Sequence, residues 1–116
     1  MISIKLLSEV LGKKVIRYDN ELQILFYRDE YDSMVWAELN IYELAHKCKE
    51  WAWRNYHYTL SSEYADNEYS CSATLTWHDF KNYPCTIEEY PIVSDTEPEA
   101  IFKACQWILD NKRKMK

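Results

Sequence analysis

Residues 40–53 read Asn-Ile-Tyr-Glu-Leu-Ala-His-Lys-Cys-Lys-Glu-Trp-Ala-Trp, and this stretch decides the fold. Asn40 is a favoured residue at a helix N-cap, and Glu43 stands three positions later, as in a capping box. The apolar residues of the stretch recur at helical spacing, so they share one side of a helix. They are Ile41, Leu44, Ala45, Cys48, Trp51 and Ala52. The sequence therefore predicts a helix from Asn40 to about Tyr56 with this side against a core.

Four other residues of the same helix form a second row. They are Tyr42, His46, Lys49 and Trp53, at spacings of four, three and four. Such spacings place side chains along one line of a helix, here away from the core side. Two alternatives stay open at this point. The row faces solvent and binds a partner, or a second layer of the same domain, such as the proline-containing segment 78–93, covers it.

Helices are also predicted near both ends of the chain. Ser3 is a suitable N-cap for a first helix, and Gly12, the only glycine, stands where a left-handed residue ends such a helix. For the last helix, Thr96 and Glu99 have capping-box spacing, and Pro98 suits the first turn. Its apolar stripe predicts a helix to about Asn111: Ile101, Ala104, Cys105, Ile108 and Leu109. The basic tail, residues 112–116, is expected to fray.

Segments with strand character lie between the helices. Alternating or β-rich patterns cover residues 14–18, 22–28, 56–64 and 69–77, and residues 34–36 form an optional further strand. Polar turn residues separate them at 19–21 and 65–68. Pro84 and Pro91 predict that residues 78–93 are irregular. The fold class is therefore α+β, with a mostly antiparallel sheet of about four strands covered by three helices, in a single domain over residues 1–116.

Charge and composition exclude several classes of protein. The formal net charge is −5, and four of the 14 basic residues lie in the last five positions, which leaves 10 basic against 19 acidic residues elsewhere. Such a body repels phosphate, so direct nucleic-acid binding is not expected. A single glycine excludes a glycine-rich phosphate loop. The sequence has neither an apolar run long enough to span a membrane nor a secretory signal, which predicts a cytoplasmic protein.

The cysteine and histidine positions do not predict a metal or another cofactor. Cys48, Cys71 and Cys105 fall on apolar sides of predicted elements, where free cysteine behaves as a small hydrophobe. We therefore expect reduced structural thiols, with a disulfide or a metal site as the alternative. The three histidines, His46, His57 and His78, have no metal-ligand spacing among themselves or with the cysteines.

The run Ser94-Asp95-Thr96-Glu97-Pro98-Glu99-Ala100-Ile101 resembles the motif (Ala/Ser)-Asp-Thr-x-Pro-x-Ala-Ile that closes the phage α-β-α sandwich domain family. The segment Leu6–Gly12 and the helix at 40–53, followed by a strand pair, are also similar to that family. The resemblance spans most of the chain except residues 78–93. It implies a small protein of phages or prophages, in the cytoplasm of the host cell. It implies no catalytic residues.

Three functional hypotheses follow. The first is a binding protein without catalysis. It is a phage-type accessory factor that engages a host protein, as a defence inhibitor, through the aromatic row of the 40–56 helix. A homodimer formed through the same row is the alternative. The second is capture of a small molecule or nucleotide signal, with phosphate held by Lys47, Lys49 and Arg54. The third is a hydrolase, which would require His78 and Asp79 to share a cleft with Cys85.

Overall fold

The computed structural model describes residues 2–64, 71–78 and 87–114, and within these ranges the chain has three helices and six strands. The class is α+β, as the sequence predicts. The order along the chain is α1 (Ile4–Leu11), β1 (Lys14–Asp19), β2 (Ile24–Arg28), β3 (Met34–Glu38), α2 (Ile41–Tyr56), β4 (Tyr58–Tyr64), β5 (Cys71–His78), β6 (Ile87–Ser94) and α3 (Glu97–Lys114).

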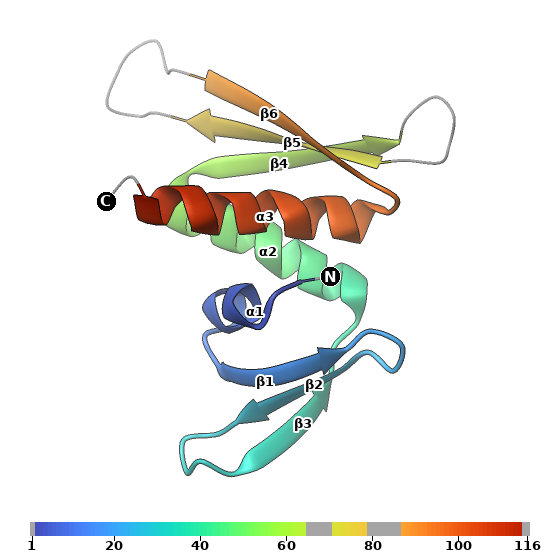
Figure 1. Ribbon diagram of the computed structural model, residues 1–116, viewed down its shortest axis with the longest axis vertical. Helices are drawn as coiled ribbons and strands as arrows, with labels where there is room; N and C mark the ends of the chain where they lie inside the picture. Colours follow the sequence, from blue (N-terminus) through green and yellow to red (C-terminus); the bar gives the residue numbers. More distant parts are fainter. Residues whose placement is uncertain (1, 65–70, 79–86, 115–116) are drawn as a thin grey trace.

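The helices form a layer between two separate antiparallel sheets (Figure 1). Sheet A has the strand order β1-β2-β3, and sheet B has the order β4-β5-β6. Both α2 and α3 pack against sheet B, while α1 packs on β1 of sheet A. The structure thus differs from the single sheet of about four strands that the patterns predict, because each group of three strands pairs only within itself.

The predicted caps begin the helices. The Ser3 hydroxyl accepts a hydrogen bond from the Leu6 N–H at 3.1 Å, and the Asn40 side chain accepts one from the Tyr42 N–H at 2.8 Å. Thr96 accepts from the Glu99 N–H at 3.3 Å at the start of α3. Gly12 ends α1 in the left-handed conformation, with φ of 64°. The helix α3 continues to Lys114, beyond its predicted end at Asn111.

The core is formed by the helix layer together with the sides of both sheets that face it. The apolar stripes of α2 and α3 face each other there, and the thiol of Cys105 lies 3.5 Å from the carbonyl oxygen of Cys48. The largest fully buried side chains come from all three helices and from β5; they are Leu6, Leu7, Leu44, Cys48, Cys71, Leu75, Ile101, Cys105, Ile108 and Leu109. The predicted core stripes of α2 and α3 are therefore confirmed, with Ile41 half-buried, whereas Ile4 of the predicted α1 stripe is exposed.

The strand β6 corrects the prediction that residues 78–93 are irregular. Its residues pair with β5 along their whole length, and Pro91 lies opposite Thr74. A proline cannot donate to a neighbouring strand, but β6 is an edge strand with a partner on one side only. Pro91 therefore fits within regular structure. Pro84 and the turn expected at 65–68 lie outside the described residues.

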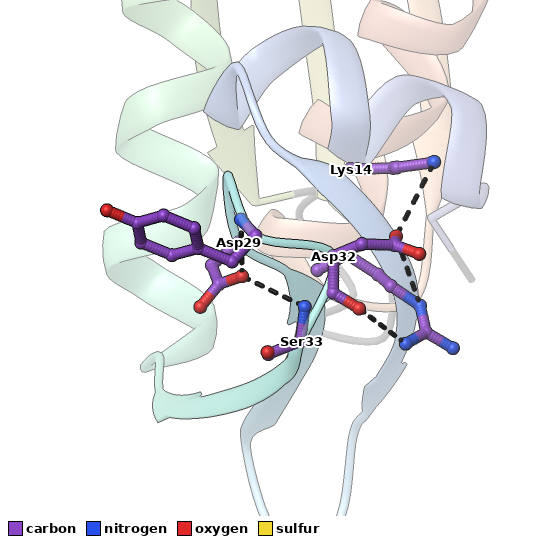
Figure 2. A network of polar contacts seen from close by, with 6 residues as sticks. Lys14, Asp29, Asp32 and Ser33 are labelled. Carbon is purple, nitrogen blue, oxygen red and sulfur yellow. Dashed lines mark hydrogen bonds and ion pairs between the residues drawn. The ribbon is translucent and has the colours of Figure 1, made fainter.

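The turn between β2 and β3 is held by an acidic network (Figure 2). The carboxylate of Asp29 accepts hydrogen bonds from the N–H groups of Tyr31 and Ser33, each at 2.9 Å. Asp32 has a φ of 62° and lies near two cations, with its carboxylate 3.9 Å from the amino group of Lys14 and 3.8 Å from Nε of Arg28. These acidic side chains therefore have a local structural role.

Candidate functional site

The row on α2 faces solvent. Tyr42 is 64% exposed and Trp53 is 41% exposed, while His46 is exposed between them and Lys49 is half-buried. The described part of the chain, including β6, leaves both aromatic side chains accessible. All four predicted residues lie together on the outer side of one helix, and residues 79–86 of the segment considered as a possible cover lie outside the described residues.

Three polar side chains of α2, His46, Glu50 and Arg54, contact one another along the helix axis, and they share His46 with this row. We call them the ion-pair chain. Nε2 of His46 lies 2.8 Å from one carboxylate oxygen of Glu50, and a guanidinium nitrogen of Arg54 lies 3.3 Å from the other. The three residues are four positions apart, so they occupy neighbouring turns of the same side of α2. Glu50 thereby orients a histidine and an arginine at once. Its role was missed from the sequence because a lone glutamate on a helix normally indicates only solvation.

The surface of α2 is hollowed near Tyr42. A depression of about 440 Å³ is bordered by Tyr42, Glu43, His46, Lys47 and Glu50. It connects Tyr42, at the first end of the row, with His46 and Glu50 of the ion-pair chain. Exposed aromatic side chains next to polar groups are typical of surfaces that bind other proteins, because the ring provides contact area and the polar groups provide orientation.

A deeper cleft of about 480 Å³ lies on the other side of Glu50, between α2, the end of α1 and the inner side of β2 and β3. Apolar side chains form much of its wall: Val10, Leu11, Leu25, Tyr27, Ala37, Leu39 and Trp51. Charged and amide side chains complete it: Glu9, Lys13, Glu38, Lys47, Glu50, Arg54 and Asn55. A site with this composition suits a ligand that has an apolar body and polar substituents.

The cleft brings together only part of the set predicted to hold phosphate. Lys47 and Arg54 border it, whereas Lys49 does not. Lys13 adds a cation that sequence reasoning missed, and its amino group lies 4.5 Å from the centre of the Tyr27 ring. No sequence signal indicates this arrangement, because the cleft residues come from four elements, α1, β2, β3 and α2. The three cations face three carboxylates, so the cleft has no strong charge of either sign.

The described cysteines are buried free thiols. A hydrogen bond with Cys48, together with burial, raises the pKa of Cys105 well above the ordinary thiol value, and burial together with the nearby carboxylate of Glu97 raises the pKa of Cys71. Both effects disfavour the thiolate that nucleophilic attack requires. Of the proposed hydrolase residues, His78 ends β5, and Asp79 and Cys85 lie outside the described residues.

Two further searches over the described ranges concern membranes and metals. Residues 2–64, 71–78 and 87–114 include no helix that is long and apolar enough to cross a membrane. In the same ranges, no group of three or more His, Cys, Asp or Glu side chains is placed to hold a metal ion.

The fold and the surface of α2 define an α+β protein with an exposed aromatic helix side. Comparison with known proteins adds nothing to this description, since no family model, no curated protein and no solved structure matches the chain.

Proposed function

We propose that this protein works by binding another protein through the outer side of α2, without catalysis. The observation that carries the proposal is the solvent exposure of Tyr42 and Trp53, two large aromatic residues on one line of a helix whose opposite side is fully buried. Burying such side chains at an interface releases water from a large apolar area. A few aromatic residues of this kind supply most of the binding energy in many complexes.

The ion-pair chain supports the same proposal. His46, Glu50 and Arg54 place alternating donors and acceptors beside the two aromatic side chains. Polar groups at the rim of an apolar contact select the partner and fix its orientation more than they add affinity. The partner surface should therefore combine an apolar centre with polar groups of both signs.

The biological setting belongs to the same proposal and rests on the resemblance of residues 94–101 to the phage family motif. We place the protein among small phage and prophage accessory factors in the host cytoplasm. The partner is then a host protein, and the role that we propose for the contact is inhibition of a host defence.

A paired capture experiment tests this function. The tagged protein and the variant Tyr42→Ala/Trp53→Ala are each used to recover partners from a lysate of the host. We expect the native chain to retain a specific host protein and the double variant to lose it, with binding at least about tenfold weaker when it is measured with that purified protein. The thermal transition of the variant should remain cooperative, because both side chains are exposed.

The matched control is Tyr64→Ala, which removes an exposed tyrosine from sheet B. This variant should recover the same partner as the native chain. A partner that is retained by the double variant would contradict binding through α2. A collapse of the thermal transition in the double variant would instead assign the row to structural packing.

The cleft favours a second candidate function, capture of a small molecule. Its walls combine aromatic side chains, Tyr27 and Trp51, with the cations Lys13, Lys47 and Arg54. A nucleotide-like signal has the matching groups, a flat ring and phosphate. Lys47 and Arg54 are the residues from the predicted phosphate set that remain in this candidate.

A thermal-shift panel of nucleotides tests the cleft. A ligand present at 100 times its dissociation constant stabilises the folded state by about 2.7 kcal/mol. Lys47→Ala should reduce the shift, whereas Lys49→Ala, two positions away and outside the cleft, should leave it unchanged. A panel without any shift, or equal loss in both variants, would remove the support for this candidate.

A further inference from the structure

The outer side of sheet A is a second surface that the function proposed above does not use. Val15, Tyr18 and Leu25 face inward and are buried in the core. Side chains alternate between the two sides of a sheet, and a register shift between Val15 and Arg17 keeps both Val15 and Tyr18 on the inner side of β1. The pairing register then assigns nine residues to the outer side. They are Lys14, Arg17, Asp19, Ile24, Phe26, Arg28, Met34, Trp36 and Glu38, and we call them the sheet A face.

The centre of the sheet A face is aromatic and accessible. Trp36 is 63% exposed and Met34 is 58% exposed. Trp36 pairs across the strands with Phe26, and the guanidinium of Arg17 lies 4.5 Å from the centre of the Phe26 ring. The helix layer packs on the opposite side of this sheet (Figure 1), and the described residues do not cover the outer side. Accessible apolar side chains gathered in one row indicate an interaction surface.

Charge is distributed unequally along the strands of this face. Lys14 pairs in register with Arg28 at one end, close to the turn that contains Asp32 (Figure 2). Asp19 and Glu38 lie in the last row at the other end, on either side of Ile24. Since β3 is an edge strand, Glu38 also borders the cleft on the inner side. The face therefore has one end with two cations, which share the Asp32 carboxylate, then an aromatic centre and an acidic end.

We infer that the sheet A face binds a second copy of this chain. A two-fold axis that lies between two such faces and runs across the strands reverses the strand direction of one copy relative to the other. Each Lys14 then faces Asp19 of the other copy, each Met34 faces Glu38, and the central row of Arg17, Phe26 and Trp36 meets its own copy. Two-fold dimers require a self-complementary surface of this kind.

A second copy fits this face better than a partner of one dominant charge. The face has cations and carboxylates in nearly equal number, whereas the chain as a whole has a formal net charge of −5. Two such chains repel each other unless opposite charges are matched locally. Three strands of five or six residues make a small interface, so we expect a dissociation constant in the micromolar range.

The dimer leaves α2 outside the interface, because α2 belongs to the helix layer on the other side of sheet A. Each dimer then presents two aromatic rows. Two linked contacts bind a repetitive or dimeric partner more tightly than one contact does.

Sedimentation equilibrium over a micromolar concentration series tests the inference. The native chain should approach a mass twice that of the 14.0 kDa monomer as the concentration rises. Trp36→Ala should weaken dimerisation by at least about tenfold. Met34→Glu, a second change at an exposed position that places a carboxylate opposite Glu38 of the other copy, should have the same effect if Trp36→Ala proves poorly folded. Trp53→Ala, which removes an exposed tryptophan from α2, should dimerise like the native chain.

Charge reversal tests the orientation of the two copies. Lys14→Glu and Asp19→Lys should each weaken the dimer, because each places like charges at a contact between opposite ends. The double variant Lys14→Glu/Asp19→Lys should restore it, and so should an equal mixture of the two single variants.

Three results would overturn the inference. A native chain that remains at 14.0 kDa throughout the series would exclude the dimer. A dimer that survives Trp36→Ala and Met34→Glu but not Trp53→Ala would place the interface on α2. Failure of the double variant to restore association would reject the opposed arrangement of charged ends.

Discussion

At the scale of single residues, Tyr18 links sheet A to the start of α2. Its hydroxyl donates a hydrogen bond to the carbonyl oxygen of Leu39 at 2.6 Å, and its ring is part of the core. The hydrogen bond therefore fixes the segment just before the cap residue Asn40. The position of Tyr18 was predicted as part of a strand, but its partner was not, because nothing in a single sequence pairs residues 21 positions apart.

We expect Tyr18→Phe to lower the free energy of unfolding by about 1–3 kcal/mol, because it leaves the buried Leu39 carbonyl without this donor. Urea denaturation at neutral pH measures the loss. Burial, and secondarily the charge of Asp19, raises the pKa of Tyr18 above its ordinary value. The stabilising contribution should therefore persist below the pKa of the unfolded chain, near 10, and decline as the pH rises through the higher folded value.

The control for this prediction is to measure the unfolding free energies of the native chain and of Tyr18→Phe over a range of pH. The difference in unfolding free energy between the native chain and Tyr18→Phe should shrink above about pH 10. A difference that stays constant into the alkaline range would show that the tyrosine ionises equally in both states.

At the scale of elements, α2 determines both the core and the proposed binding surface. Its cap therefore affects stability more than recognition. We expect Asn40→Ala to destabilise the fold by about 1 kcal/mol, since the Tyr42 N–H loses its acceptor, and Asn40→Asp to retain most of the stability. Chemical denaturation of the three proteins measures this. Equal stability of Asn40→Ala and the native chain would mean that packing alone holds the first turn.

Elements with strong local signals were predictable, and those without them were not. The three helices have caps and apolar stripes that act within a few residues, so their starts were identified correctly. The strand β6 was missed because Pro91 normally interrupts strands, and its acceptability depends on the edge position that only the tertiary structure reveals. The division into two sheets also depends on long-range packing and not on strand pattern.

The candidate site was predictable in part for the same reason. Tyr42, His46, Lys49 and Trp53 were grouped correctly because a single helix places them. Their exposure depends on what packs beside α2, which periodicity does not specify. The cleft was not predicted, since Lys13, Tyr27 and Trp51 meet there only after three elements assemble.

At the scale of the whole molecule, the two sheets occupy opposite sides of one helix layer, and the proposed interfaces use different parts of this arrangement (Figure 1). Binding through α2 and dimerisation through sheet A are therefore separable by mutation. Trp53→Ala should affect only the former and Trp36→Ala mainly the latter, which is why each serves as a control for the other.

The order of strand pairing has a consequence for how the chain folds. In both sheets every strand pairs with its neighbour in sequence, so each sheet can form by successive hairpins. Such local topology shortens the conformational search and is typical of rapid folding. The contact that closes the molecule is the distant one, between Ser3 and Gln106, whose side chains lie 2.6 Å apart. We therefore expect the joining of α1 and α3 to be a late step of folding, because it brings together residues 103 positions apart and requires that α3 has emerged from the ribosome.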